Sequence, residues 1–207
     1  MSSATWLAFA TASAVLLVIP GPTILLVISY ALGRGVRVAL PVAAGVALGD
    51  FTAMSLSMLG IGALLAASAT LFTVLKWLGA AYLVWLGINL WRAGGRLQVD
   101  PAGEEVSSRR ILAHAWLVTA LNPKSITFFV AFVPQFIDQH AAFWPQVMVL
   151  EATFVTLAFL NAAGYALAAS RTRSIFSSAR AVGVFNRIGG SLLIGAGIAA
   201  AGWRSSQ

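Results

Sequence analysis

Two short stretches, Ile19-Pro20-Gly21-Pro22 and Asn122-Pro123-Lys124, carry the residues whose types and spacing could do chemistry in this chain of 207 residues. Each stretch interrupts a long apolar run. A proline lacks the backbone N–H, and its ring clashes with the carbonyl four residues back, so a helix cannot continue unchanged through either stretch. In hydrocarbon such breaks are tolerated only where protein covers them or where they line a wet cavity, and transporters use them to bind substrates and ions. Both breaks are therefore candidate binding sites.

Asp50 and Lys124 are the charged residues expected deepest in the membrane. Counted from the ends of their apolar runs, each lies about 18 Å along its helix, close to the bilayer midplane. An ionised side chain at that depth costs on the order of 3 kcal/mol unless it is paired or wetted. A chain with six acidic residues has nevertheless placed one there. An inert salt bridge between the two is one interpretation, and a substrate or proton site is the other.

The candidates for substrate binding or proton coupling are Pro20, Gly21, Pro22, Asp50, Asn122, Pro123, Lys124 and Glu151. Structural interpretations compete with this one. The prolines of the first stretch would also serve as a simple helix kink, and Asn122 would also serve as a cap for the helix that Pro123 begins. No catalytic residue is expected. Neither histidine has evident ligand spacing and the chain has no cysteine, so we predict no metal site, no cofactor and no disulfide.

Composition places the chain among membrane proteins. Hydrophobic residues make up 59% and charged residues 9%, with a mean hydropathy of +0.89, whereas an ordinary soluble domain carries about 25% charged residues. A net charge of +7 would suggest nucleic acid as the partner of a soluble protein. In a membrane protein, excess arginine in short loops sets the orientation instead. We therefore expect a lipid bilayer and no nucleic acid as partner, and no cleaved signal peptide, because residues 1–30 contain no Lys or Arg.

Six apolar runs are long enough for spanning helices, which need about 20 residues. They cover about 5–32, 38–66, 74–91, 111–136, 144–169 and 183–203, and the aqueous segment lies at about 93–110. The sequence thus predicts an all-α integral membrane protein with six transmembrane helices in one domain, 1–207. Small residues in the second run predict close helix packing; they are Ala43, Ala44, Gly45, Ala47 and Gly49.

The two halves of the sequence match one another. Pro22 matches Pro123 and Asp50 matches Glu151 at one common offset, and each half closes with a helix that has two glycines eight residues apart. Three spans per half is an odd number, so the second half must insert upside down relative to the first. We predict two inverted three-helix repeats with broken first helices, at about 5–92 and 111–204, joined by a cytoplasmic loop at about 93–110.

The arginine distribution predicts the orientation. The loops after the first, third and fifth runs hold the arginines Arg34, Arg37, Arg92, Arg96, Arg109, Arg110, Arg171, Arg173 and Arg180. Because positively charged loops stay in the cytoplasm, both termini are expected to be extracytoplasmic.

Several motifs together resemble the lysine exporter superfamily, specifically its homoserine/threonine exporter branch. They are Ile19-Pro20-Gly21-Pro22, the stretch 78–87 (Leu-Gly-Ala-Ala-Tyr-Leu-Val-Trp-Leu-Gly), Asn122-Pro123-Lys124 with Phe128-Phe129, and Asn186-Arg187-Ile188-Gly189-Gly190. The resemblance spans essentially the whole chain. It implies a small bacterial inner-membrane exporter of amino acids driven by proton exchange. It assigns no role to Glu151 or Asn161.

We therefore expect a multi-pass inner-membrane efflux transporter, not an enzyme, that exports a small neutral amino acid or derivative by proton-coupled antiport with alternating access. In this hypothesis Lys124 and the helix starts after the breaks face the substrate carboxylate. Asp50 and the freed carbonyls around Leu16, Val18 and Thr119 take the ammonium group. Protons on Asp50 or Glu151 provide the coupling.

Two alternatives stay open at this stage, a divalent metal exporter of similar fold and a non-transporting membrane partner protein. A metal exporter should show clustered oxygen ligands, which two acids on separate helices do not predict. The identity of the amino acid, the stoichiometry of coupling and the presence of a homo-oligomer are not determined by the sequence.

Overall fold

This computed structural model describes residues 1–67, 107–138 and 140–171, with scattered positions in 77–92 and 183–198. The helices are α1 (Ser3–Val18), α2 (Pro22–Arg34), α3 (Ala39–Ala67), α5 (Ser108–Ala120), α6 (Pro123–Ala131) and α7 (Phe143–Arg171), with short 3-10 helices η1 (Gly35–Val38) and η2 (Val133–Phe136). The described residues contain no strand, so the all-α prediction is confirmed for them.

Two of the described helical stretches are long and apolar enough to cross a membrane, Pro22–Gly60 and Phe143–Arg171. The pair Ser108–Ala120 and Pro123–Phe136, bent by 47°, makes a third if it is one broken span. Apart from those scattered positions, the predicted runs 74–91 and 183–203 and most of the 93–110 loop lie outside the described residues. The six-span arrangement therefore stays a prediction.

Both predicted breaks are present. The first break, residues 19–21, separates α1 from α2, and the second break, residues 121–122, separates α5 from α6. In each case a proline, Pro22 or Pro123, is the first residue of the second helix. A proline costs least there, because the N–H it lacks would have no partner inside the helix.

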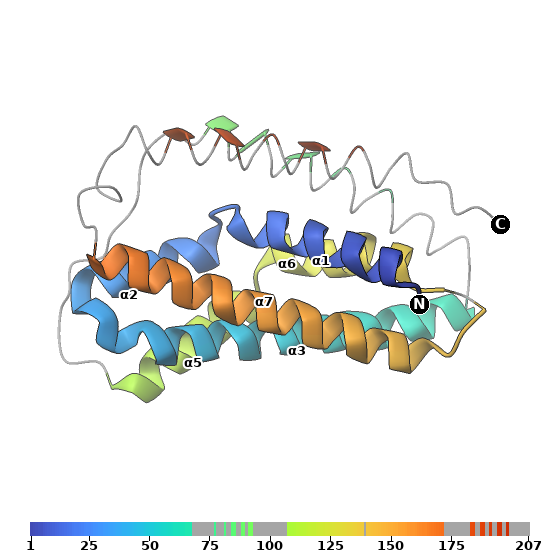
Figure 1. The fold of residues 1–207 in the computed structure, drawn as a ribbon, viewed down its shortest axis with the longest axis horizontal. Coiled ribbons are helices and arrows are strands. Elements are labelled where there is room, and N and C mark those ends of the chain that lie inside the picture. Colours follow the sequence, from blue (N-terminus) through green and yellow to red (C-terminus); the bar gives the residue numbers. More distant parts are fainter. Residues whose placement is uncertain are drawn as a thin grey trace.

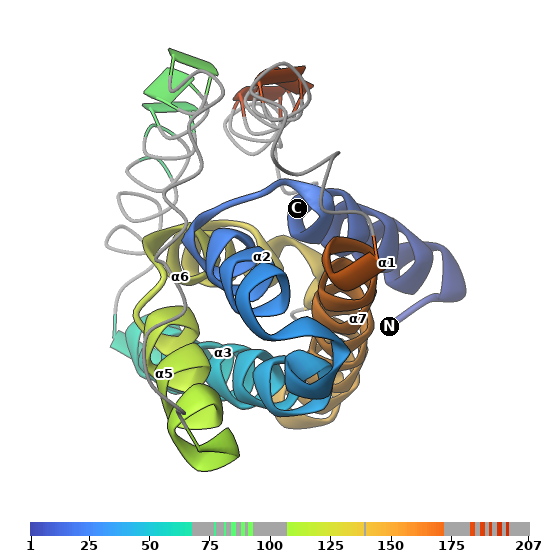
Figure 2. The same cartoon turned by 90° about the vertical axis from the view of Figure 1, so that its left-hand side faces the viewer.

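The two broken helices run in opposite directions. Figure 1 shows α1 and α2 running one way along the long axis, and α5 and α6 running the other way. The long helices α3 and α7 are also antiparallel. In the end view of Figure 2, α2 lies between α3, α6 and α7. In this arrangement Ile19, Pro20 and Gly21 of the first break and Asn122 of the second are buried.

Two tryptophan–threonine hydrogen bonds tie the halves together. Trp6 Nε1 on α1 donates to Thr153 Oγ1 on α7 at 3.0 Å, and Trp116 Nε1 on α5 donates to Thr52 Oγ1 on α3 at 3.1 Å. The two threonines are separated by the offset that matches the halves of the sequence. Each half thus contributes a broken helix that binds the long helix of the other half.

Helices α3 and α5 cross at very short range. A Cβ atom on Gly49 would lie 2.6 Å from Thr119 Cβ and 2.7 Å from Trp116 O, and one on Gly45 would clash with Leu112 O. Only glycine fits at these two positions, so the prediction of close packing through small residues in this run is confirmed. This crossing places Asp50, the residue after Gly49, beside the end of α5.

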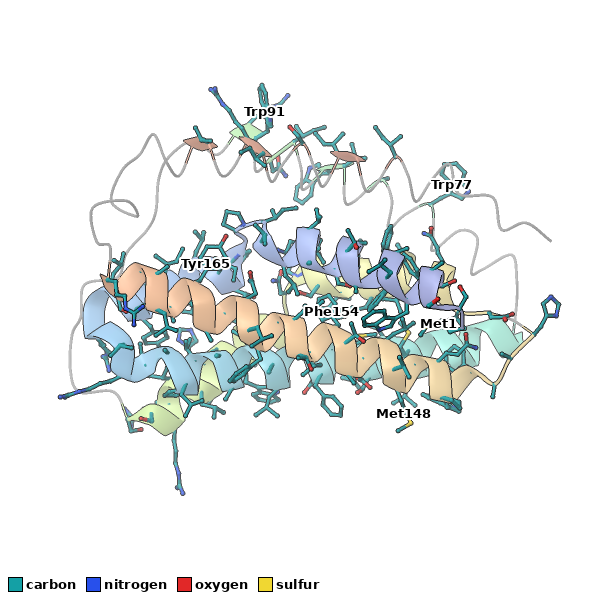
Figure 3. The ribbon with its side chains drawn as sticks, viewed as in Figure 1. Met1, Trp77, Trp91, Met148, Phe154 and Tyr165 are labelled. Carbon is teal, nitrogen blue, oxygen red and sulfur yellow. The ribbon has the colours of Figure 1, made fainter. Side chains whose placement is uncertain are left out.

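An aromatic cluster holds α6 against α7. The ring centroids of Phe128 and Phe129 lie 5.8 and 4.8 Å from that of Phe154, and all three side chains are buried. Figure 3 shows Phe154 near the middle of α7 and Tyr165 closer to its end. Edge and offset ring contacts of this kind stabilise beyond the area they bury, so they hold α6 in place against α7.

Candidate functional site

The first break leaves four carbonyl groups at the end of α1 without helical partners. In a continuous helix the carbonyls of residues 16–19 would accept from the N–H groups of residues 20–23. Pro20 and Pro22 have no N–H, and Gly21 is extended (φ −123°, ψ −170°). Leu16 O keeps one local donor, the N–H of Ile19 at 3.3 Å. At membrane depth the remaining carbonyls need partners from other parts of the chain.

Lys124 binds two of these carbonyls. Its Nζ donates to Leu16 O at 3.2 Å and to Ile19 O at 2.9 Å, and its side chain is 8% exposed. The aliphatic part of the side chain lies over the first break, because a Cβ on Gly21 would be 3.4 Å from Lys124 Cε. The C-terminal end of a helix carries partial negative charge, which favours a cation at this position.

Two residues of α7 bind the other carbonyls. Asn161 Nδ2 donates to Leu17 O at 3.0 Å, and Tyr165 Oη donates to Val18 O at 2.7 Å; Figure 3 shows Tyr165 beside the first break. Sequence reasoning left Asn161 without a role and did not single out Tyr165. The available signal was two hydrogen-bonding side chains four residues apart on one face of an apolar helix.

Asn122 closes the second break and links it to the first. Its Oδ1 accepts from the Lys124 backbone N–H at 3.0 Å, so the predicted helix cap is present. Its Nδ2 donates to Thr23 Oγ1 at 2.9 Å, and Thr119 Oγ1 also donates to Thr23 Oγ1 at 3.4 Å. The start of α2 is therefore fastened to the junction of α5 and α6.

Asp50 faces the same region from α3. It is 2% exposed and lines one cavity together with Ser125. Its Oδ1 has no partner within the part of the chain that the structure describes. The hydrogen bonds of Lys124 Nζ go to carbonyl oxygens rather than to Asp50. The two opposite charges thus share one region without the direct contact that an inert salt bridge requires.

A small cavity lies between the two breaks. Its volume is about 20 Å³, which is room for about one water molecule. The polar residues that line it are Thr23, Asp50, Asn122, Lys124, Ser125 and Asn161, and aliphatic side chains complete the wall. The structure therefore brings Asp50, Asn122 and Lys124 together, as predicted. Pro20, Gly21, Pro22 and Pro123 shape the breaks and do not line this cavity.

Glu151 lies apart from the cavity. Its Oε1 accepts from Ser55 Oγ at 2.6 Å across the α3–α7 interface. Asn161 follows it by ten residues on α7, which is about 15 Å of helix. The structure thus does not place Glu151 with the other predicted site residues.

Comparison with known proteins gives consistent matches. The sequence matches the LysE type translocator family over residues 14–202. It is 39% identical over 193 residues to a membrane protein of Vibrio cholerae, covering 93% of this chain and 94% of that protein. It is 33% identical over 198 residues to the homoserine/homoserine lactone efflux protein of Salmonella typhimurium (95% and 96% covered). It is 33% identical over 171 residues to the leucine efflux protein of Klebsiella pneumoniae (77% and 78% covered). No solved structure matches the chain.

Proposed function

The chain belongs to the LysE type translocator family, and on that premise we propose that it exports a small neutral amino acid or amino-acid derivative across the bacterial inner membrane. The family match confirms the resemblance seen in the proline and glycine motifs. Relatives named for homoserine and leucine efflux support this substrate class.

The observation that carries the proposal is one cavity between the two breaks. A cation, an anion and neutral polar groups line it. A free amino acid is a zwitterion, so it needs an acceptor set for its ammonium group and a donor set for its carboxylate. Asp50 and the carbonyls of the first break supply acceptors. Lys124 and the start of α6 supply donors.

The balance of charge in the cavity favours a neutral side chain. Of the described residues, one carboxylate and one lysine line it, and the rest of its wall includes Leu16, Leu17 and Val46. Among the described residues this leaves no surplus negative charge for a basic side chain and no group of carboxylates for a divalent cation. A neutral amino acid such as threonine, homoserine or leucine matches this lining.

The size of the cavity supports alternating access. At about 20 Å³ the space is far smaller than any amino acid, so substrate entry requires an opening of the bundle. The antiparallel halves support a mechanism in which one inverted repeat rocks against the other. In our proposal, protons carried on Asp50 or Glu151 couple this motion to proton entry.

Efflux from preloaded membrane vesicles tests the function. Vesicles that contain the protein should lose labelled threonine, homoserine or leucine faster than vesicles with the Asp50→Asn protein, and an inward proton gradient should accelerate the loss. Release of lysine or arginine alone would contradict the neutral substrate class.

The orientation is tested separately. In our proposal both termini are extracytoplasmic and Ser107 lies in the cytoplasm. The chain has no cysteine, so Ser2→Cys and Ser107→Cys each introduce a single thiol. A membrane-impermeant thiol reagent should label the first and not the second in intact cells. The reverse pattern would invert the topology.

A further inference from the structure

The carbonyl oxygens of Leu16 and Ile19, here called the carbonyl pair, already bind a primary ammonium group. Lys124 Nζ lies 3.2 Å from the first oxygen and 2.9 Å from the second. The α-ammonium of an amino acid is the same chemical group, with the same three N–H donors. A side chain of the protein thus makes the contact that a substrate ammonium would make.

The carbonyl pair differs from its neighbours in the charge of its donor. Leu17 O accepts from the neutral amide of Asn161, and Val18 O accepts from the neutral phenol of Tyr165. The carbonyl pair binds a cation at the negative end of the α1 dipole, and hydrogen bonds from charged donors are about twice as strong as neutral ones. Two carbonyl oxygens that accept from one ammonium nitrogen form a preformed cation site.

The charges around the carbonyl pair are not matched to one another. Lys124 is buried and binds carbonyls, while Asp50 lines the same cavity and its buried Oδ1 has no partner in the described residues. A buried charge is costly unless an opposite charge or several hydrogen bonds compensate for it. An incoming zwitterion supplies both missing groups, a carboxylate for Lys124 and an ammonium for Asp50 and the carbonyl pair.

Space leads to the same conclusion. The cavity has no room for an amino acid while the Lys124 side chain lies against Gly21, with Cε and Nζ 3.4 Å from a Cβ built there. Withdrawal of this side chain would free a channel of its own length beside the carbonyl pair. Substrate entry and displacement of Lys124 therefore need the same volume.

We propose that the carbonyls of Leu16 and Ile19 are the ammonium subsite for the exported amino acid, and that Lys124 is a resident cation that fills this subsite until substrate displaces it. Once displaced, the Lys124 ammonium binds the substrate carboxylate. This inference rests on the proposed function and deepens it, because it names the two oxygens that bind the substrate ammonium and gives Lys124 a role in the empty transporter.

Chemical rescue with a small amine tests the subsite. Lys124→Ala removes three carbons and one nitrogen, which are the atoms of n-propylammonium. The purified variant should gain thermal stability with n-propylammonium chloride, with Tm rising by about 3–6 °C at ten times the dissociation constant. Wild type and Lys124→Met should show no such rise, because their own side chains fill the space.

The controls separate an ammonium site from weaker explanations. n-Propanol has the same shape without the charge, and potassium chloride supplies a cation without N–H donors; neither should reproduce the rise in Tm. An equal rise with either compound, or an equal amine effect on wild type, would overturn the assignment.

A second comparison tests the exchange with substrate. L-leucine should stabilise the wild type, where Lys124 can bind its carboxylate, and 3-methylbutylamine, which is leucine without the carboxylate, should not. In Lys124→Ala the order should reverse, with the amine stabilising more than leucine does. Stabilisation of Lys124→Ala by leucine at the wild-type concentration would contradict the role of Lys124.

Two further outcomes are distinguishable. If Lys124→Ala does not fold, Lys124→Gln replaces it, because a neutral amide is a weaker donor that methylammonium can displace. Methylammonium should then raise the Tm of Lys124→Gln and not of wild type, and equal shifts would refute the subsite.

A wild type that exports amino acids while neither variant responds to amines would refute the subsite alone. Amine rescue in a protein that exports no amino acid would refute the function alone.

Discussion

The two breaks are built from similar sequence and closed in different ways. The second break is closed by its own residues, because Asn122 N–H donates to Thr119 O at 3.0 Å and the Asn122 side chain caps Lys124 N–H. The first break is closed by Lys124, Asn161 and Tyr165, which are more than 100 residues away along the chain. Gly21, at the position that corresponds to Asn122, has no side chain with which to cap α2. The second break is therefore autonomous, whereas the geometry of the first depends on where the other half of the molecule lies.

The largest expected effect comes from the two charges that meet at the first break. Lys124→Gln and Asp50→Asn should each insert in the membrane, since an amide still forms hydrogen bonds. Each should lower uphill export by about 10–100-fold, the equivalent of one lost charged hydrogen bond. Efflux from preloaded vesicles, with and without a pH gradient and normalised to inserted protein, measures this.

The double variant decides between a site and a scaffold. If Lys124 and Asp50 only neutralise each other, Lys124→Gln with Asp50→Asn should restore transport, because no buried charge is left unpaired. We expect no restoration. Full activity in the double variant would leave the first break as structure rather than binding site.

The next largest effect is expected at Gly49, where α3 and α5 cross close to the second break. Gly49→Ala should lower the free energy of unfolding by about 1–3 kcal/mol through overpacking against Thr119 and Trp116. Gly60→Ala on the same helix is the matched control, because no atom of the described residues lies within 4 Å of the added methyl. It should change stability by less than about 1 kcal/mol. Thermal or denaturant unfolding in detergent compares the two variants. Equal losses of stability would mean that close packing at Gly49 does not stabilise the protein.

The difference between the two breaks can be tested by changing the uncharged side chains that close them, Asn161 at the first break and Asn122 at the second. Asn161→Ala strands Leu17 O and should cost about 1–3 kcal/mol, with faster hydrogen exchange in the last turn of α1 and no change at the second break. Asn122→Ala should cost about 1 kcal/mol and speed exchange at the start of α6. Exchange mass spectrometry resolves the two regions. Acceleration at the second break in the Asn161→Ala protein would mean that the second break is not autonomous.

The smallest effect is expected at Glu151. Glu151→Gln keeps an acceptor for the Ser55 hydroxyl and lies outside the cavity. Downhill exchange of labelled substrate should change by no more than about twofold, as for substitutions away from a binding site. A loss as large as that of Asp50→Asn would place Glu151 in the substrate path.

Local chemistry accounts for the parts of the site that were predictable. The prolines identified both breaks and the carbonyls that lose partners at Leu16 and Val18. Asn122 was recognisable as a cap, and the depth of Asp50 and Lys124 followed from run length. The partners that replace lost helical hydrogen bonds come from helices far along the chain, so Asn161 and Tyr165 depended on tertiary packing. The match of Asp50 with Glu151 predicted a shared role, whereas the two positions have different surroundings. Asp50 lines the cavity, and Glu151 accepts a hydrogen bond from Ser55.

The distant closure of the first break has a consequence for biosynthesis. While the chain emerges from the ribosome, α1 and α2 enter the bilayer before Lys124, Asn161 and Tyr165 have been translated. During that interval the carbonyls at the end of α1 lack their final donors, and the tryptophan of α1 lacks its threonine on α7. The first half of the nascent protein therefore lacks the hydrogen bonds that close its break until the second half is made. It acquires its mature geometry only when the second half arrives.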